Sequence, residues 1–302
     1  MMMYDLIIIG AGPAGITAAI YASRKRMSLL VLSKDIGGQT LWTADIENYT
    51  GYNIVTGAQL SDKFREHIKV YGINVSEDEA VQSLVKRDGI LTVKTGKDSY
   101  GAKAVIVASG KTPKMLDVPG EEEFRNKGVA YCATCDGPLF AGKRVSVVGG
   151  GNSALSAAIA LSRIAGRVSV INNTMALAGD VILQEALEKA ANVTIYNDAI
   201  VQGIVGDNFV TGIDVSLPQG QTRIPLEGVF VEIGLTPNSG FAKDIRKNSL
   251  GEIEIDCACQ TSVSGVFSAG DVTDVPEKQI IIAAGEGAKA ALSAFDYIVN
   301  HF

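Results

Sequence analysis

The sequence lacks the segments by which a chain crosses or enters a membrane. No apolar run in its 302 residues approaches the roughly 18 residues that a spanning helix needs. The start, Met1 to Asp5, carries neither a basic segment nor a small-residue cleavage site, so we expect no signal peptide. These absences favour a cytoplasmic protein that acts without a membrane.

Basic clusters and cysteines are also scarce. The chain has 27 Lys and Arg residues against 33 Asp and Glu, and the positive residues form no block. This composition argues against a nucleic-acid partner. Four cysteines are too few to build a disulfide framework at this length. Two of them form a C-x-x-C, which in a cytosolic protein indicates a redox pair or a metal site.

Glycine, in contrast, is abundant, with 33 residues. One cluster, Gly10 to Gly15, follows the apolar run Leu6 to Ile9, which is typical of a buried parallel strand. A helical pattern comes next, and Leu29 to Leu32 is a second apolar run. The order strand, glycine turn, helix and strand predicts a nucleotide-type βαβ unit.

The same order recurs later in the chain. Val145 to Val148 predicts a strand, Gly149 to Ala154 a glycine turn, Ala154 to Ile164 a helix and Val168 to Ile171 another strand. Turn-rich segments on either side, ending with Gly234 to Ser239, indicate two chain crossings between domains. The second unit is therefore expected to be inserted into the first.

We predict an α/β protein of two Rossmann-like, three-layer domains. The first domain would comprise residues 1–113 and 244–302, and the second, residues 114–243, would carry the C-x-x-C pair. In such turns the first glycine allows a tight bend, the second lets the backbone approach a pyrophosphate, and the third lets helix and strand pack closely. The alternative is an ordinary glycine turn that only packs a helix onto a sheet.

The residue near the end of the second strand of such a unit usually contacts the ribose. In the first unit the candidates are Ser33 and Asp35, and in the second unit the position falls at Asn172. No Lys or Arg lies between Val168 and Leu187. A 2′-phosphate would find no cation there, which argues against NADPH in its usual mode.

Cys132-Ala-Thr-Cys135 followed by Asp136 is the segment that indicates chemistry. A thiol in a C-x-x-C has a lowered pKa and exchanges readily with a disulfide, and the neighbouring Asp136 can carry a proton. The alternatives are inert buried thiols and a zinc site completed by Cys257 and Cys259, which a strand would place on one face. We expect the redox function, no metal, and a structural role for Cys257 and Cys259.

The Cys132 to Asp136 segment, preceded by Gly128 to Tyr131, closely resembles thioredoxin reductase and the C-terminal reductase part of the alkyl hydroperoxide reductase flavoprotein subunit. The likeness extends along essentially the whole chain. It includes Gly10 to Gly15, Gly37 to Thr40, Ile46 to Tyr49, Val118 to Gly120, Cys132 to Leu139, Gly149 to Ala154, Gly234 to Asn238, Ser268 to Asp271 and Gln279 to Gly287.

The resemblance implies a role for each part of the site. Cys135 would face a flavin and receive its electrons, Cys132 would attack the disulfide of a thioredoxin-like protein, and Asp136 would manage protons. Such proteins are homodimers. The implied FAD site comprises Gly10, Gly12, Ala14, Gly15, Ser33, Asp35, Gly38, Gln39, Asn48, Gly110, Gly270, Asp271, Gln279 and Ile280, and the nicotinamide nucleotide site comprises Gly149, Gly151, Asn152, Ser153 and Asn172.

The nucleotide part of this pattern is altered. Where NADPH-using relatives carry a His-Arg-Arg run and a downstream Arg, this chain has Asn172 to Thr174 and Ala178. The acidic residue that the NADH-using hydroperoxide reductase subunit has at position 172 is missing, and Ser156 replaces a Glu near the nicotinamide. We expect the electron donor to be NADH or a non-nucleotide donor such as ferredoxin or a deazaflavin, and not NADPH.

The expected function is an FAD-dependent dithiol–disulfide oxidoreductase that reduces thioredoxin or a thioredoxin-like protein. Two alternatives stay open. One is a peroxiredoxin reductase of the alkyl hydroperoxide reductase type, and the other is a flavoprotein redox sensor without steady turnover.

Overall fold

A computed structural model describes residues 2–43, 45–87 and 89–302. Met1, at which the predicted first domain begins, lies outside the described residues. Within this part of the chain no helix is both long and apolar enough to cross a bilayer. The helices are α1 Pro13–Arg24, α2 Gly57–Val70, α3 Ala133–Asp136, α4 Asn152–Ser162, α5 Val181–Glu188 and α6 Ile280–His301, with 3₁₀ turns η1 Gly38–Trp42 and η2 Gly137–Phe140.

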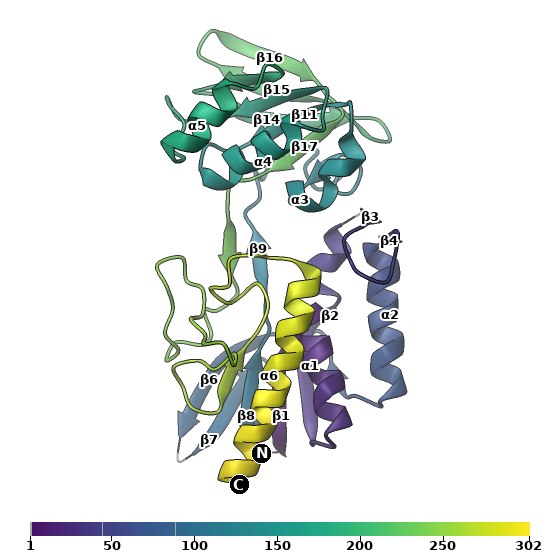
Figure 1. Cartoon of the computed structure of the whole chain (residues 1–302), viewed down its shortest axis with the longest axis vertical. Coiled ribbons are helices and arrows are strands. Elements are labelled where there is room, and N and C mark those ends of the chain that lie inside the picture. The colour runs from purple at the N-terminus through teal and green to yellow at the C-terminus, as the bar shows by residue number, and fades with distance from the viewer. Residues whose placement is uncertain (1, 44, 88) are drawn as a thin grey trace. The chain divides into compact units, whose positions relative to one another are not determined.

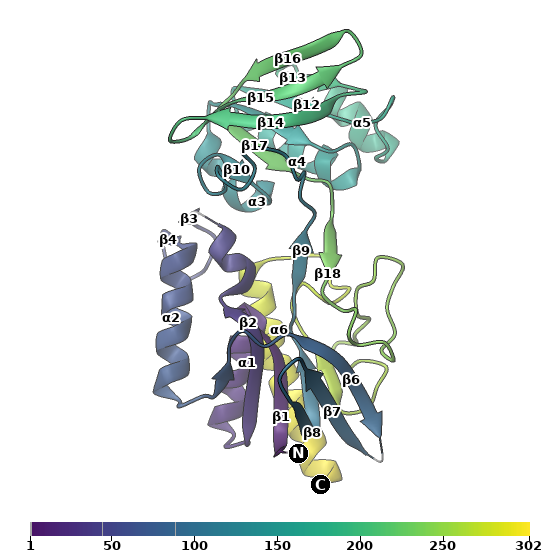
Figure 2. The same cartoon turned by 180° about the vertical axis from the view of Figure 1, so that it is seen from behind.

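The chain divides into two compact units. The first comprises Met1–Leu41, Tyr49–Thr112 and Thr236–Phe302, and the second comprises Trp42–Asn48 and Pro113–Leu235. The chain passes between the units in β9 (Lys111–Pro113) and again in β18 (Leu235–Pro237). These two strands pair with each other and are seen side by side in Figure 2.

The domain boundaries differ from the sequence-based ones in three places, and the smallest difference moves Pro113 to the second unit. Residues 236–243, expected in the second domain, belong to the first unit. The reason is that Asn238 is bound there: its backbone N–H donates to Gly110 O at 3.0 Å, and its side-chain amide donates to Ser109 O at 2.9 Å. Trp42–Asn48, expected in the first domain, is grouped with the second unit, where the Trp42 and Tyr131 rings lie 6.0 Å apart in a tilted arrangement.

The first unit contains one mixed sheet in the order β5-β2-β1-β8-β7-β6, with β19 also paired to β8. Strands β5, β2, β1, β8 and β19 are parallel, and β7 and β6 continue antiparallel. Its strands are β1 Met2–Ala11, β2 Leu29–Ile36, β5 Val75–Ser76, β6 Val81–Arg87, β7 Ile90–Thr95, β8 Ser99–Val107 and β19 Val266–Ser268; β3 Asp45–Ile46 and β4 Val55–Thr56 form a separate pair.

Strand β1 lies at the centre of this sheet and is buried on both faces, as its continuous apolar run predicts. Leu6 and Ile8 belong to the core under α1 and α6, while Ile7 and Ile9 belong to the core on the opposite face. The two helices lie side by side along the sheet in Figure 1. They approach so closely that a Cβ at Gly287 of α6 would lie 2.0 Å from Ala14 O of α1.

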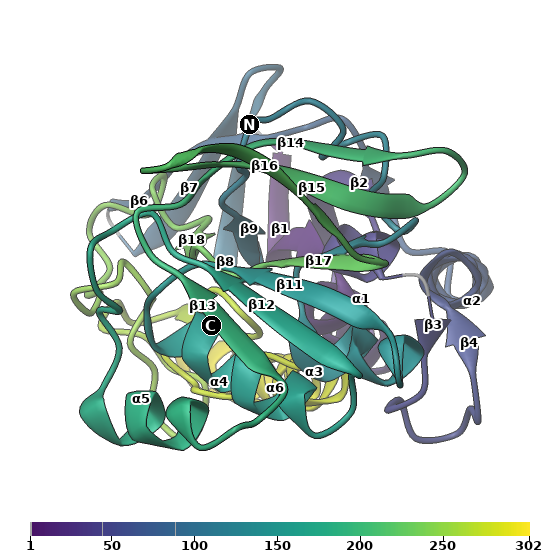
Figure 3. The ribbon, with the colours of Figure 1, turned by 90° about the horizontal axis from the view of Figure 1, so that it is seen from above.

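The second unit has three layers, seen from above in Figure 3. A parallel sheet in the order β10-β17-β11-β12-β13 has α3, α4 and α5 on one face and the antiparallel sheet β14-β15-β16 on the other. Both fold predictions, two Rossmann-type domains and three layers, are confirmed. The strands are β10 Val129–Ala130, β11 Arg144–Val148, β12 Arg167–Ile171, β13 Val193–Tyr196, β14 Ile200–Gly206, β15 Val210–Leu217, β16 Gly220–Pro225 and β17 Gly228–Val231.

Candidate functional site: two glycine turns and a dithiol

The first glycine turn lies between β1 and α1, and its glycines have different functions. A Cβ at Gly10, whose φ is +107°, would lie 2.2 Å from Ala108 O, and one at Gly15 would lie 1.9 Å from Gly10 O. These two glycines therefore permit close backbone packing. A Cβ at Gly12 would have Gly37 O at 3.9 Å as its nearest neighbour. Gly12 thus faces open space at the start of α1.

The other predicted cofactor residues gather around this turn, because the parallel strands of the first unit end at the same edge. The Cβ position of Gly38 is 3.6 Å from Gly12 Cα, and that of Gly270 is 3.0 Å from Ala14 Cβ. Gln39 Nε2 donates to Asp271 Oδ2 at 3.4 Å. Residues far apart in sequence are thus brought to one place.

These residues fit a dinucleotide cofactor with a polyhydroxylated linker. Gly12 is the N-cap of α1 and supplies no side-chain cap, so the first N–H groups of the helix can receive a pyrophosphate. Burial raises the pKa of Asp271, while Lys278 and Lys111 pull it down. A partly buried carboxyl with one long hydrogen bond from Gln39 suits the hydroxyl groups of a ribityl chain.

Ser33 and Asp35, the two candidates for contact with the ribose, differ in burial and in hydrogen bonding. Ser33 is buried, and its hydroxyl accepts from Ala11 N at 3.1 Å and donates to Asp35 O at 2.6 Å. It therefore fixes the strand end. The Asp35 side chain is exposed and accepts from Gly38 N at 2.9 Å, so Asp35 is the residue positioned at the surface of the turn.

The remaining predicted cofactor residues lie at loop and helix starts. Gly110 has φ +64° with nothing within 4 Å of a Cβ. Gln279 is the extended residue before α6, and Ile280 is its first helical residue, with no side-chain cap. Asn48 differs from the others, because it lies in the segment grouped with the second unit.

The cysteines predicted to react form a disulfide, Cys132–Cys135, at the start of α3. Both are partly exposed, and Thr134 between them is exposed. Cys132 Sγ accepts a hydrogen bond from Cys135 N at 3.2 Å. Ala133 and the following Phe140 belong to the core beneath α4, which holds this short helix on the sheet.

Two carboxyl groups lie near the disulfide. Burial, and secondarily the charge of Asp45, raises the pKa of Asp136 to about 7. Burial also raises the pKa of Glu232 to about 7, against the lowering effect of the hydrogen bond that its Oε1 accepts from Ala133 N at 3.4 Å. Both groups can therefore exchange protons near neutral pH.

The second glycine turn borders a cavity of about 650 Å³. A Cβ at Gly149, whose φ is +138°, would lie 2.4 Å from Glu232 O, whereas one at Gly151 would meet nothing within 4 Å. Gly151 is the N-cap of α4 and supplies no side-chain cap. The cavity is lined by Met115, Leu116, Val118, Val148, Gly149 to Ser153, Ile171, Asn173, Ala199 to Val201 and Glu232 to Gly234.

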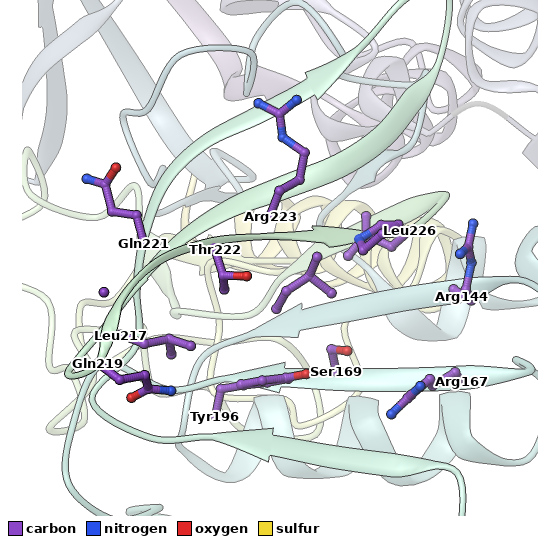
Figure 4. Close-up of a pocket in the computed structure, with 13 residues that line it drawn as sticks. Arg144, Arg167, Ser169, Tyr196, Leu217, Gln219, Gln221, Thr222, Arg223 and Leu226 are labelled. Carbon is purple, nitrogen blue, oxygen red and sulfur yellow. The ribbon is translucent and has the colours of Figure 1, made fainter.

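A separate cavity of about 530 Å³ opens between the two sheets of the same unit (Figure 4). Arg144 and Arg167, at one end, occupy paired positions on β11 and β12, and Tyr196 lines its floor. Arg144 pairs with Glu227 and Arg223 with Asp214. No residue of the disulfide or of the glycine turn lines this cavity.

Comparisons with known proteins agree with this geometry. Residues 4–287 match the family model described as pyridine nucleotide-disulphide oxidoreductase. The chain belongs to this family. It is 43% identical to the F subunit of the alkyl hydroperoxide reductase of Pseudomonas putida over 98% of the chain and 58% of that protein. It is 42% identical to an NADH dehydrogenase of Bacillus subtilis over 99% of the chain and 59% of that protein.

Among solved structures, the thioredoxin reductase of Streptococcus pyogenes is similar over 99% of both chains, with a TM-score of 0.94 and 37% identity. The expected resemblance to thioredoxin reductases and to the alkyl hydroperoxide reductase subunit is therefore confirmed, as is the assignment to oxidoreductase enzymes. The chain spans about 58% of the curated relatives it matches.

Asn172, which the sequence suggested as a ribose ligand, is not among the residues that line the cavity. Its side chain is buried. Its amide donates to Thr174 O at 2.9 Å and Asn197 Oδ1 at 2.8 Å, and its Oδ1 accepts from the Thr174 hydroxyl at 2.9 Å. The exposed neighbour Asn173 lines the cavity instead. Asn152, another predicted nucleotide residue, bonds Asp180 at 3.1 Å.

The strand expected around Cys257 and Cys259 is absent. Cys259 has φ +61°, and Asp256 accepts hydrogen bonds from Ala258 N and Gln260 N at 2.9 Å, so the segment is a turn. The turn leaves Cys257 exposed and Cys259 buried, on different sides. Among the described residues, no group of three or more His, Cys, Asp or Glu could hold a metal ion.

Glu232 and a buried charge cluster in the first unit were not predicted from the sequence. Lys111 and Glu252 form an ion pair in which both side chains are about 8% exposed, and Lys278 is 3.4 Å from the same carboxylate. Burial would raise the pKa of Glu252, but the hydrogen bonds from Lys111 and Asn248 give a net lowering. These residues lie in turns or at strand ends, and they are too far apart in the sequence for any regular spacing to indicate that they meet.

The internal hydrogen bonds of Asn172 make a testable prediction. Asn172→Ala should lower the free energy of unfolding by about 1–3 kcal/mol, because it removes the hydrogen bonds that the buried Asn172 side chain makes to Thr174 and Asn197. Urea unfolding measures this, with exposed Asn173→Ala as the control that should leave stability unchanged. Unaltered stability of the Asn172 variant with weaker nucleotide binding would restore Asn172 as a ribose ligand.

Proposed function

We propose that this protein is an FAD-dependent dithiol–disulfide oxidoreductase that reduces thioredoxin or a thioredoxin-like protein. The observation that carries the proposal is the partly exposed Cys132–Cys135 disulfide at the start of α3, in a chain of the pyridine nucleotide-disulphide oxidoreductase family. The similarity to the Streptococcus pyogenes thioredoxin reductase over the whole chain supports it.

FAD is the cofactor that we propose for the first unit. Gly12 and the uncapped start of α1 would hold its pyrophosphate, Asp35 would lie near the ribose, and Asp271 with Gln39 would hold the ribityl chain. The bound flavin supplies the two-electron chemistry. The protein supplies the binding site, the disulfide and the proton-exchanging groups.

The two cysteines have separate roles. Reduction of the Cys132–Cys135 bond consumes two electrons and two protons. The Cys132 thiolate then attacks one sulfur of the partner disulfide, and Cys135 attacks Cys132 in the mixed disulfide, which re-forms the Cys132–Cys135 bond and releases the partner as a dithiol. The backbone N–H of Cys135, which points at Cys132 Sγ, favours a thiolate at Cys132.

Asp136 is the residue that we propose as proton carrier. Its pKa of about 7 leaves comparable amounts of acid and base at neutral pH, the condition under which a carboxyl exchanges protons efficiently. Its backbone N–H donates to Cys132 O at 3.0 Å, which fixes it one helical turn from the attacking cysteine.

For the electron donor we propose NADH. The cavity beside the second glycine turn has no Lys, Arg or His in its lining, and Lys114 reaches only its edge at Gly234, so a 2′-phosphate inside the cavity would meet no cation. The Bacillus subtilis relative named NADH dehydrogenase supports the same preference. Ferredoxin or a deazaflavin remains the alternative donor.

The partner can be a free thioredoxin or a thioredoxin-like module that serves a peroxiredoxin. The 43% identity to the F subunit of alkyl hydroperoxide reductase favours the second arrangement as an alternative function. We further propose a homodimer in a reducing compartment such as the cytoplasm, which light scattering of the purified protein and fractionation of cells would test.

Cys135→Ser should abolish electron transfer to the partner. The assay reduces the flavin of the purified protein with light and an artificial donor, then counts new thiols on thioredoxin; peroxide consumption with a peroxiredoxin and no thioredoxin tests the alternative. Cys257→Ser, an exposed cysteine outside the disulfide, is the control and should retain full transfer. Thioredoxin thiols appearing at the normal rate in the Cys135 variant would refute the dithiol route.

Asp136→Asn should slow cleavage of the Cys132–Cys135 disulfide by dithiothreitol, since the leaving thiolate loses its proton donor. Both proteins are cleaved by the same reagent, so the ratio of the wild-type rate to the variant rate does not depend on how much of the dithiothreitol is ionised at a given pH. With a pKa of about 7, Asp136 is protonated below neutrality, so the ratio should be tenfold or more at pH 6 and approach one at pH 8.5. Asp207→Asn, at an exposed turn, serves as control. A ratio that does not vary with pH would exclude Asp136 as the donor.

Anaerobic mixing with NADH should bleach the flavin absorbance, whereas NADPH should do so only at far higher concentration, because the cavity lacks a cation for the extra phosphate. The measurement is the absorbance change near the flavin maximum against the concentration of each nucleotide. Efficient bleaching by NADPH contradicts the preference. No bleaching by either nucleotide directs the search to ferredoxin or deazaflavin, or to a sensor without turnover.

A further inference from the structure

Glu232 is the ionisable side chain among the residues that line the nucleotide-type cavity. It follows directly after β17 (Gly228–Val231). Its backbone carbonyl lies so close to Gly149 of the glycine turn that a Cβ at Gly149 would be 2.4 Å from Glu232 O. The carboxyl is therefore built into the wall of the cavity whose turn and helix start suit a pyrophosphate.

The carboxyl is also held in place. Its Oε1 accepts a hydrogen bond from Ala133 N at 3.4 Å, and Ala133 is the buried first residue of α3. This contact keeps the group at the cavity instead of letting it turn out to water. Because it is partly buried, its negative charge is poorly screened there.

No cation in the cavity lining balances this charge. Charged groups on the surrounding elements include Asp136 on α3, Lys114 and Glu121 after β9, and Asp180, which accepts a hydrogen bond from Asn152 at the start of α4. Glu121 is occupied by the N–H groups of Leu116 and Asp117. Lys114 reaches only the edge, with its Nζ 3.9 Å from the Cβ position of Gly234.

We propose that a dinucleotide anion enters this cavity together with one proton, which the Glu232 carboxyl holds while the ligand is bound. An ionised Glu232 and a pyrophosphate in one cavity would repel each other, whereas a protonated Glu232 removes the repulsion and can donate a hydrogen bond. This inference rests on the proposed use of a nicotinamide dinucleotide. It adds a residue that makes the affinity for that ligand depend on pH.

The sign of the pH dependence follows from the ionisation of Glu232. Its pKa of about 7 in the empty cavity rises further when an anion binds beside it, so binding takes up a proton above pH 7. The dissociation constant should then increase with pH above 7, by up to tenfold per pH unit, and should be constant below pH 6.

The test uses ADP-ribose, which carries the pyrophosphate but cannot reduce the flavin. Titration calorimetry of the holoprotein from pH 6 to pH 8.5, in buffers of different ionisation enthalpy, measures both the dissociation constant and the protons taken up. The wild type should take up close to one proton at pH 8. Glu232→Gln, which keeps an acceptor for Ala133 N, should take up none and bind about tenfold more tightly than the wild type at pH 8.

Glu227→Gln is the matched control, because Glu227 lies just before β17, pairs with Arg144 and does not line this cavity. It should behave as the wild type. A Glu232→Gln variant with the wild-type pH dependence, or with weaker binding at pH 8, overturns the inference. If neither the wild type nor the Glu232→Gln variant binds ADP-ribose at pH 6, the inference is also overturned, and the proposal of a nicotinamide dinucleotide as electron donor fails with it. The proposed dithiol route is unaffected by that result, because it is tested separately with artificially reduced flavin.

Discussion

Two carbonyl groups fix the geometry on which both halves of this protein depend. At the end of β8, Ala108 O would lie 2.2 Å from a Cβ at Gly10, and after β17, Glu232 O would lie 2.4 Å from a Cβ at Gly149. In each unit the chain turns from the central strand into a helix, and the first glycine of the turn lies directly against the end of a neighbouring strand. This glycine, Gly10 or Gly149, also has a positive φ. Only glycine meets both demands. The turn then leaves the second glycine, Gly12 or Gly151, facing open space.

The consequence differs between the units. In the first, residues that follow four different strands lie around the turn, and the partly buried Asp271 provides an acceptor for hydroxyl groups. In the second, the equivalent space has apolar walls and a carboxyl, without a cation. The same glycine turn thus forms two different sites. The site in the first unit suits a tightly held cofactor, and Glu232 weakens the binding of anions at the site in the second unit.

The dithiol depends on the second unit in a different way. Its helix α3 is only four residues long and cannot be stable alone. Ala133 and Phe140 pack it into the core below α4, and Glu232 accepts a hydrogen bond from its first residue. Cavity, carboxyl and disulfide therefore share one rigid framework, which is why a group that lines the cavity also contacts the redox helix.

Local sequence patterns were enough for the central strands, the glycine turns and the pairing of Cys132 with Cys135, because each depends on neighbours within a few residues. The insertion of the second domain followed from the recurrence of the same local pattern between two turn-rich segments. The position of Asn172 and the turn at Cys259 were not predictable. Asn172 is withdrawn from the cavity by Thr174 and Asn197, and the second of these lies on the far side of β13 in the sequence. The return of the chain at Thr236 is likewise set by contacts between Asn238 and Ser109.

The sequence by itself determined which chemistry this chain carries, since thiols, glycines and the absence of cations near residue 172 are properties of composition and order. The tertiary structure alone decided which carboxyl groups stand beside that chemistry. Asp136 is adjacent to its cysteine in the chain, but its raised pKa comes from burial, and Glu232 reaches α3 across almost a hundred residues. Desolvation and contacts between distant segments arise only when the layers pack.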